Sequence, residues 1–241
     1  MKVTFDATGV VVVITGGAQG IGAALASAIT SYGGTAVVFD VVKPSDPAVS
    51  FVEVDVADRA AVDSAVAGVV AKYGRIDGLV AGAAVQPRSA VLDLDPAEWS
   101  RTLQVNLDGV VWACQAVVPH MVAQRSGSVV VFTSGMALTG YPGAAAYATS
   151  KAGLVAFAKS LAAEVAADRV RVNVVAPGVI DTEQFRNANH GVDREHWRET
   201  IGIGDPEDVV GPLLFLLSDA ATMTGSTLTR ERAFSSEGGV R

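Results

Sequence analysis

Short apolar segments alternate with stretches of helical periodicity along most of the chain. Six apolar runs have the length of buried strands: residues 10–14, 35–40, 50–55, 79–84, 129–133 and 170–176. Apolar residues recur at helical spacing between them, which predicts helices over residues 21–32, 58–73, 96–121 (with a break), 147–165 and 205–217. Regular alternation of strands and helices predicts a parallel sheet with right-handed crossovers.

The pattern therefore predicts the α/β class, with a doubly wound parallel sheet of the Rossmann type in three α/β/α layers. Half of the residues are hydrophobic but only 6% are aromatic. The core must then consist mainly of Val, Ala, Leu and Ile, as in sheets buried on both faces. No break in composition marks a second domain, and we expect one domain over residues 1–241.

Charge and cysteine content narrow the functional classes. The formal net charge is −7 and no basic stripe is visible, which argues against a nucleic-acid partner. Cys114 is the single cysteine, so no disulfide framework is expected. No apolar stretch approaches the roughly 20 residues of a membrane span. We expect a cytoplasmic protein that associates with no membrane.

A glycine-rich segment follows the first expected strand. Thr15-Gly16-x-x-x-Gly20-x-Gly22 connects that strand to the first expected helix. Glycines in this position let the main chain approach a pyrophosphate, and the following helix N-terminus offers it free N–H groups. The placement between a strand and a helix is the context that a dinucleotide site requires.

Asp40 stands at the end of the second expected strand, where an acid accepts hydrogen bonds from the adenosine ribose hydroxyls. A carboxylate there repels a 2′-phosphate, and the glycine loop contains no Lys or Arg to reverse that preference. The sequence therefore predicts NAD as the cofactor in preference to NADP.

Tyr147 and Lys151 lie four residues apart, on one face of the fourth expected helix. A neighbouring ammonium group favours the phenolate and lowers the pKa of a tyrosine. A tyrosine adjusted in this way moves protons near neutral pH. The pair predicts acid–base chemistry, with Lys151 lowering the Tyr147 pKa.

These residues together resemble the short-chain dehydrogenase/reductase (SDR) family, in its single-domain branch of about 250 residues. Further matches are the pair Asp55-Val56, Asn106, Ser134 thirteen residues before Tyr147, and Pro177-Gly178-Val-Ile180-Asp-Thr182. The resemblance covers nearly the whole chain. It implies an NAD-dependent oxidoreductase that interconverts a secondary alcohol and a ketone.

The resemblance also implies a role for each matching residue. Tyr147 is the general acid–base group, Ser134 polarises the substrate oxygen, Lys151 holds the nicotinamide ribose, and Asn106 organises a water that relays protons. The implied cofactor site consists of Gly16, Gln19, Gly20, Ile21, Asp40, Asp55, Val56, Ala81, Gly82, Tyr147, Lys151, Pro177, Gly178, Ile180 and Thr182. No metal is expected.

The substrate side is less determined. By family position, the candidate substrate residues are Gln86, Arg88, Met136, Tyr141, Phe185 and Arg186. Arg88 and Arg186 either hold an anionic group of the substrate or are solvated surface arginines. Sugars, polyols, cyclic alcohols and hydroxy acids all stay open as substrates. The resemblance further implies a homotetramer, or a homodimer, through the helices that end near Met121 and Val165.

The chain departs from the family pattern in two places. Ala81-Gly82-Ala83-Ala84 replaces the usual Asn-Asn-Ala-Gly, which predicts lower local stability. About six extra residues lie around Arg230-Glu-Arg-Ala-Phe234, and the role of residues 230–241 stays open. These departures leave one alternative from another class, a nucleotide-binding regulatory protein with little turnover. The chain length disfavours SDR epimerases and dehydratases, and the Tyr–Lys spacing disfavours enoyl reductases.

Overall fold

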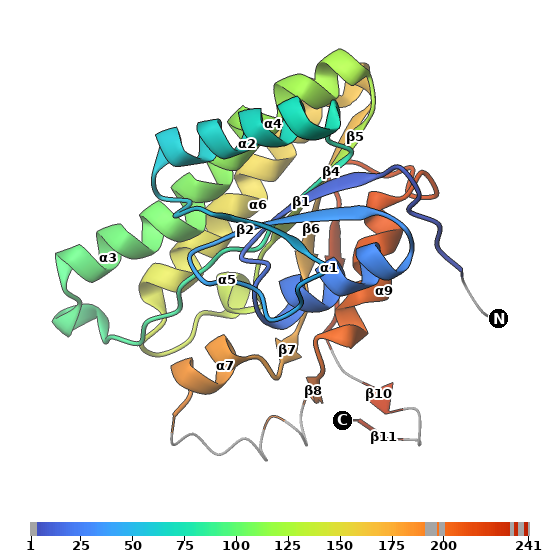
Figure 1. Cartoon of the computed structure of the whole chain (residues 1–241). Helices are drawn as coiled ribbons and strands as arrows, with labels where there is room; N and C mark the ends of the chain where they lie inside the picture. Colours follow the sequence, from blue (N-terminus) through green and yellow to red (C-terminus); the bar gives the residue numbers. More distant parts are fainter. Residues whose placement is uncertain (1–3, 191–196, 198–200, 232–233, 236–238, 241) are drawn as a thin grey trace.

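The computed structural model describes residues 4–190, 197, 201–231, 234–235 and 239–240. Its centre is a parallel sheet with the strand order β3-β2-β1-β4-β5-β6-β9. The strands are β1 (Val11–Thr15), β2 (Thr35–Asp40), β3 (Ser50–Glu53), β4 (Gly78–Ala81), β5 (Gly127–Phe132), β6 (Val170–Ala176) and β9 (Thr227–Thr229). The order reverses between β1 and β4, where crossovers leave on opposite faces (Figure 1).

Helices cover both faces of this sheet (Figure 1). The helices α1 (Gly20–Ser31) and α9 (Glu207–Leu217) contact each other on one face. The other face carries α2 (Arg59–Tyr73), α4 (Gly109–Gln124) and α6 (Ala145–Val165). The fold is therefore the doubly wound, three-layer, single-domain α/β arrangement that the sequence predicts.

The alternation of side chains along β1 shows how the two layers form. Val11 and Val13 belong to the core beneath α2, α4 and α6. Val12 and Ile14 belong to the core beneath α1 and α9. All four are buried, because a central parallel strand is covered on both faces. A continuous Val run is thus the sequence signature of this position.

The stretch predicted as one broken helix is in fact three consecutive helical segments. Pro96–Leu103 forms α3, Gln104–Asp108 is a π-helical turn, and Gly109 begins α4. Asp95 caps α3 by accepting a hydrogen bond from the Ala97 N–H at 2.8 Å. A π-turn inserted between α-helices rotates the side chains that follow, and such turns are frequent at functional sites.

Several small elements lie at the carboxyl edge of the sheet (Figure 1). They are α5 (Met136–Thr139), β7 (Val179–Ile180), α7 (Glu183–Ala188), β8 (Ile203–Gly204), β10 (Phe234–Ser235) and β11 (Gly239–Val240). β7 pairs with β8, and β10 pairs with β11. Short 3₁₀ turns cover Val91–Asp93 and Ala166–Asp168. No helix in the described part of the chain has the length and apolarity needed to cross a membrane.

Candidate active site

One large cavity, of about 780 Å³, lies at the carboxyl edge of the sheet. The ends of β1, β2, β4, β5 and β6 all contribute to its wall. The predicted site residues that line it are Gly16, Gln19, Gly20, Ile21, Asp40, Asp55, Val56, Gly82, Gln86, Ser134, Met136, Tyr141, Tyr147, Lys151, Pro177, Gly178, Ile180, Thr182 and Phe185. Residues predicted from separate motifs therefore share one cavity.

The glycine loop brings the main chain close to the β4 end and to α1. Gly16 has a φ of 69°, and a Cβ there would meet the main-chain N and Cα of Ala83 at 2.6 Å. Gln19 caps α1 without a side-chain hydrogen bond, and no acidic residue lies in the first turn. The first N–H groups of α1 are therefore left for a ligand, and the loop fits a dinucleotide pyrophosphate.

Asp40 stands beside this loop at the end of β2. Its Oδ2 accepts a hydrogen bond from the Ala18 N–H at 3.0 Å, and its Oδ1 accepts one from the Val42 N–H at 3.1 Å. These two main-chain donors orient the carboxylate at the cavity wall. Asp40 thus occupies the position that a ribose-binding acid needs.

Asp55 lies on the same side of the cavity and is paired with Arg101 of α3, with 2.8 Å between Oδ2 and Nη2. Burial acts to raise the pKa of the Asp55 carboxyl, but the Ala57 N–H and the Arg101 guanidinium lower it below its usual value. Arg101 also lines the cavity, although no sequence motif pointed to it.

The unusual segment Ala81–Ala84 is held by main-chain and hydroxyl contacts in place of asparagine amides. The Gly82 N–H donates to the Thr15 carbonyl at 3.0 Å. The Ala83 N–H donates to Thr15 Oγ1 at 3.3 Å. Ala81 itself is fully buried and does not line the cavity. The cradle at the β4 end is therefore formed without the missing side chains.

Asn106 sits in the π-turn and is fully buried. Its Oδ1 accepts the Val85 N–H at 2.8 Å, and its Nδ2 donates to the Val85 carbonyl at 2.9 Å. Nδ2 also contacts Ser150 Oγ at 3.2 Å, and Ser150 donates to the Tyr147 carbonyl at 2.7 Å. Asn106 does not line the cavity. In this structure it connects the segment after β4 to α6.

Two hydrogen bonds attach α6 to the end of β5. Thr133 Oγ1 donates to the Lys151 carbonyl at 2.9 Å, and Lys151 Nζ donates to the Phe132 carbonyl at 3.0 Å. Lys151 is almost fully buried, and this burial lowers its pKa to about 8. The attachment places Ser134, just after β5, next to Tyr147 near the start of α6.

The electrostatics of Tyr147 differ from the sequence prediction. Burial raises the pKa of the Tyr147 phenol, and a hydrogen bond from Ser134 and the positive charge of Arg88 oppose that rise. Lys151 Nζ lies 5.8 Å from the centroid of the Tyr147 ring. Lys151 donates to the Phe132 carbonyl, and the cation that opposes the rise in the Tyr147 pKa in this structure is Arg88.

The segment after β6, residues 177–182, lines the cavity and contacts the glycine loop. Gly178 has a φ of 77°, and a Cβ there would lie 2.6 Å from the Arg230 carbonyl oxygen. Thr182 caps α7 by accepting the Phe185 N–H at 3.1 Å. A Cβ on Gly20 would lie 2.9 Å from Thr182 Cγ2. The glycine loop and the segment after β6 are thus in contact.

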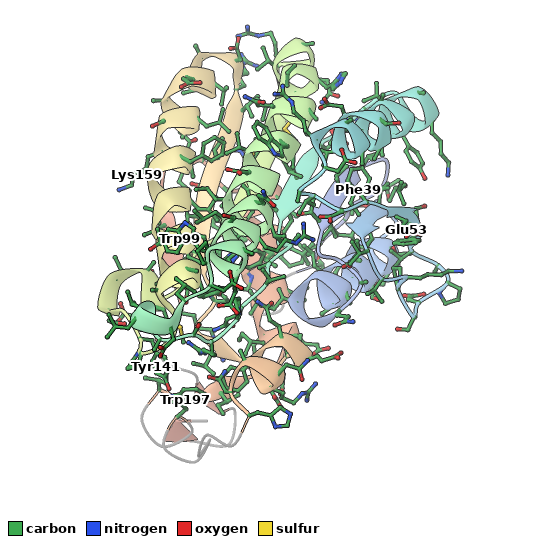
Figure 2. All side chains as sticks on the ribbon, turned by 90° about the vertical axis from the view of Figure 1, so that its left-hand side faces the viewer. Phe39, Glu53, Trp99, Tyr141, Lys159 and Trp197 are labelled. Atoms are coloured by element: carbon green, nitrogen blue, oxygen red, sulfur yellow. The ribbon has the colours of Figure 1, made fainter. Side chains whose placement is uncertain are left out.

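Three aromatic side chains form a wall at the end of the cavity where the sequence predicts the substrate. The ring centroids of Phe185 and Trp197 lie 5.1 Å apart, and those of Tyr141 and Trp197 lie 6.3 Å apart. Figure 2 shows Tyr141 and Trp197 close together at this edge. Gln86 and Met136 also line this end. We call this region the substrate chamber.

The two arginines predicted as substrate ligands lie outside the cavity wall. Arg186 is paired with Asp181, with 3.5 Å between Nη1 and Oδ2. Arg88 donates to residues at the end of α7 and lies 4.7 Å from the Tyr141 ring centroid. A family position alone did not reveal that both side chains have partners within the protein.

The end of β9 and the two residues after it are part of the cavity wall, and the sequence did not predict them there. Thr229, Arg230 and Glu231 all line the cavity. The Arg230 N–H donates to the Ala176 carbonyl at 2.9 Å, and its guanidinium donates to Asp208 at 3.1 Å. β9 pairs parallel to β6, so both strands end at the same edge of the sheet. This pairing brings the residues to the cavity, and no sequence motif indicates it. Residues 232–233, 236–238 and 241 lie outside the described part.

No group of three or more His, Cys, Asp or Glu side chains in the described part of the chain is arranged to hold a metal ion.

The cavity presents a glycine loop, an acid at the end of β2, and a Ser–Tyr–Lys group at one edge of the sheet. This placement suits a dinucleotide laid across the carboxyl ends of the strands, at the point where the strand order reverses.

Comparisons with known proteins place this geometry among dehydrogenases. The model of the short chain dehydrogenase family matches residues 10–193. The 3-oxoacyl-[acyl-carrier-protein] reductase FabG of Chlamydia muridarum is 32% identical over 233 residues, 90% of this chain and 94% of that protein. The probable galactose dehydrogenase GalD of Rhizobium meliloti is 36% identical over 234 residues, 90% of this chain and 91% of that protein.

A solved structure agrees with these sequence matches. The ligand-free aldohexose dehydrogenase AldT of Thermoplasma acidophilum superposes with a TM-score of 0.87 and 29% identity. The superposition covers 93% of this chain and 92% of that one.

Proposed function

Because the chain belongs to the short-chain dehydrogenase/reductase family of oxidoreductases, we propose that it transfers hydride between NAD(H) and a secondary alcohol or its ketone. The observation that carries this proposal is that Ser134, Tyr147 and Lys151 line the same cavity as the glycine loop and Asp40. A dinucleotide bound along the loop would then end at the group that handles protons.

Tyr147 is the proposed general acid–base group. In alcohol oxidation its phenolate takes the hydroxyl proton, and in ketone reduction its phenol returns it. Bound NAD(H) accepts or supplies the hydride. Ser134 donates a hydrogen bond to the substrate oxygen and stabilises the charge that develops there. Ser134 and Tyr147 already interact in this structure, which supports their action on one oxygen atom.

Lys151 and Asn106 have supporting roles in this proposal. Lys151 lies one turn from Tyr147 and would hold the nicotinamide ribose hydroxyls. Its Nζ keeps a fixed place through the Phe132 carbonyl. With NAD bound, its charge and that of the oxidised nicotinamide would both favour the phenolate. Asn106 would organise the water that leads protons away, at the junction between the post-β4 segment and α6.

NAD is the proposed form of the cofactor. Asp40 is held at the cavity wall by two main-chain N–H groups, so a 2′-phosphate would meet a fixed carboxylate. Gly16, Gln19, Gly20 and Ile21 would contact the pyrophosphate and ribose. Asp55 and Val56 would face the adenine, and Pro177, Gly178, Ile180 and Thr182 would face the nicotinamide end.

The experiment that tests this proposal measures NADH formation with a panel of secondary alcohols, polyols, sugars and hydroxy acids, with a parallel NADP arm. The relatives are named for an acyl-carrier-protein ketone and for sugars, so the hydroxy acids of the panel include the 3-hydroxyacyl form of that ketone, beside the sugars. Turnover that prefers NAD supports the proposal. A silent panel despite tight NADH binding would favour the alternative of a nucleotide-binding regulatory protein.

We also propose a homotetramer, or a homodimer if the segment after β9 blocks one interface. Trp112 and Ala116 on α4, and Phe157 and Leu161 on α6, are apolar and only partly buried in the single chain. A second copy would cover such a face by isologous packing. Light scattering that gives the mass of one chain would contradict this arrangement.

A further inference from the structure

Arg88 joins three segments around the substrate chamber. Its Nε donates to the Ala188 carbonyl at 3.2 Å, and its Nη2 donates to Asn189 Oδ1 at 2.9 Å, at the end of α7. Its Nη1 contacts Met136 Sδ at 3.8 Å, and its guanidinium lies over the Tyr141 ring. One side chain therefore holds α7 against the segment that precedes α6.

The acceptors of Arg88 are themselves fixed. Asn189 is almost fully buried, and its Nδ2 donates to the Phe185 carbonyl at 2.7 Å. Phe185 contacts Trp197 in the aromatic wall. The attachment of Arg88 thus extends through the last turn of α7 to the side chains that cover the substrate chamber. A planar guanidinium that donates to two oxygens keeps such a geometry better than a single ammonium does.

The residues around Arg88 are connected to the proposed catalytic group. Val85 is held on both its N–H and its carbonyl by Asn106. The Ser89 N–H donates to the Gly143 carbonyl at 2.9 Å, just before α6. The segment 85–89 is therefore fastened on either side of Arg88, so the main chain fixes the place from which the Arg88 side chain extends.

Among the described residues, no carboxylate forms an ion pair with Arg88. Arg88 is half-buried, and burial lowers its pKa. Tyr147 and Tyr141 are the ionisable groups that interact with its charge. A half-buried cation without a carboxylate acts more strongly on neighbouring phenols than a solvated one.

We propose that Arg88 is a positioning residue that fastens α7 over the substrate chamber and holds a positive charge at the Tyr141 ring, from where it acts on the Tyr147 phenol. When α7 is seated, the charge is in place and favours the phenolate. When α7 is released, the guanidinium loses its two oxygen acceptors and the constraint on its position. Closure of the chamber and readiness of Tyr147 are thereby linked. The proposal rests on the proposed function, in which Tyr147 handles the proton.

The other charged groups on the elements around Tyr147 have partners of their own. Lys151, on the same helix, is bonded to the Phe132 carbonyl, and Ser134 after β5 contributes a neutral hydroxyl. Asp181 and Arg186, on either side of the start of α7, form an ion pair with each other. Among the described residues, Arg88 is the charge whose removal should move the Tyr147 titration.

The test compares Arg88→Met, which removes the charge and the donors, with Arg88→Lys, which keeps the charge but not the planar fork. Tyr147 ionisation is followed by the ultraviolet absorbance of tyrosinate, each protein being measured against its own Tyr147→Phe derivative to subtract the other tyrosines. Amide hydrogen exchange over residues 183–189 reports the seating of α7. Arg59→Met is the matched control, because Arg59 also lies over an aromatic ring, Trp112, but outside the cavity.

We expect Arg88→Met to raise the Tyr147 pKa by about one pH unit and to speed exchange in α7. Arg88→Lys should speed exchange while its Tyr147 titration stays closer to the wild type. Arg59→Met should change neither. An unchanged Tyr147 titration in Arg88→Met would overturn the proposal even if α7 loosens, because Arg88 would then be structural only. Unchanged exchange in both variants would overturn it as well.

Both readouts work without substrate, so they are independent of whether the alcohol panel shows turnover. If Arg88→Met does not fold, the test rests on Arg88→Lys. An amide exchange rate in α7 equal to that of the wild type would then contradict the proposal that Arg88 fastens α7. With an active substrate, the alcohol-oxidation profile adds a third readout. Loss of the charge should move the rise of kcat/KM to higher pH, whereas a purely structural defect should lower the plateau without moving the rise.

Discussion

The Lys151 ammonium group donates a hydrogen bond to the main-chain carbonyl of Phe132 at 3.0 Å, within the buried junction of α6 and β5. The contact fixes the cation but leaves it in surroundings that disfavour charge. Burial accordingly lowers the Lys151 pKa to about 8. Because the folded protein must keep this buried group charged at neutral pH, Lys151 reduces the free energy of unfolding there.

This burial predicts a pH-dependent gain in stability for Lys151→Met. Below pH 8 the folded protein holds a charge that the unfolded chain solvates freely, so the variant should be more stable by about 1–3 kcal/mol at pH 7. Between the folded pKa and the unfolded value the unfolded chain binds more protons, so wild-type stability rises with pH and the difference shrinks. Urea unfolding at several pH values measures this. A gain that is independent of pH would contradict the cause.

The contacts of Asn106 with Val85 predict that replacing Asn106 lowers the stability of the fold, apart from any effect on catalysis. Asn106→Ala should lower the free energy of unfolding by about 2–4 kcal/mol, because the Val85 N–H and carbonyl both lose their partners. Gln104→Ala, an exposed position in the same π-turn, is the control and should change little. Equal effects of the two substitutions in chemical denaturation would show that the Val85 contacts are unimportant.

Asp40 predicts the choice of nucleotide. Asp40→Ala should reduce the ratio of kcat/KM for NAD over NADP at least about tenfold, a difference of about 1.4 kcal/mol, since it removes the carboxylate that faces a 2′-phosphate. Asp46→Ala, which removes an acid outside the cavity wall, should leave the ratio unchanged. Steady-state kinetics with both nucleotides decides. A wild-type enzyme that prefers NADP would already contradict the assignment.

The central fold was predictable because its signals are local. The runs at residues 35–40 and 170–176 coincide with β2 and β6, and the helix predicted from residue 58 is α2, which Asp58 caps by accepting hydrogen bonds from the N–H groups of Ala60 and Ala61. The Val-rich runs are long enough to form strands and are bounded by turn residues. Their burial on both faces leaves no competing arrangement for these segments.

The carboxyl edge was less predictable because its structure depends on contacts distant in sequence. α7 is short and polar and is held by Thr182 and Asn189 as well as by Arg88. β9 has three exposed residues and is defined by its pairing with β6. The hydrogen bond from Lys151 to the Phe132 carbonyl fixes the ammonium group, and no motif encodes that contact. Such features follow from tertiary geometry, not from spacing.

The most direct measurement compares kcat of the wild type with that of Tyr147→Phe on the alcohol that the wild type oxidises fastest. Tyr32→Phe, which loses a hydroxyl at an exposed position on the other side of the sheet, is the matched control. If Tyr147 is the acid–base group, its variant should lose about 10²–10⁴-fold in turnover, keep NADH binding, and differ from Tyr32→Phe. A Tyr147→Phe variant that retains most of the wild-type turnover would contradict the proposed chemistry.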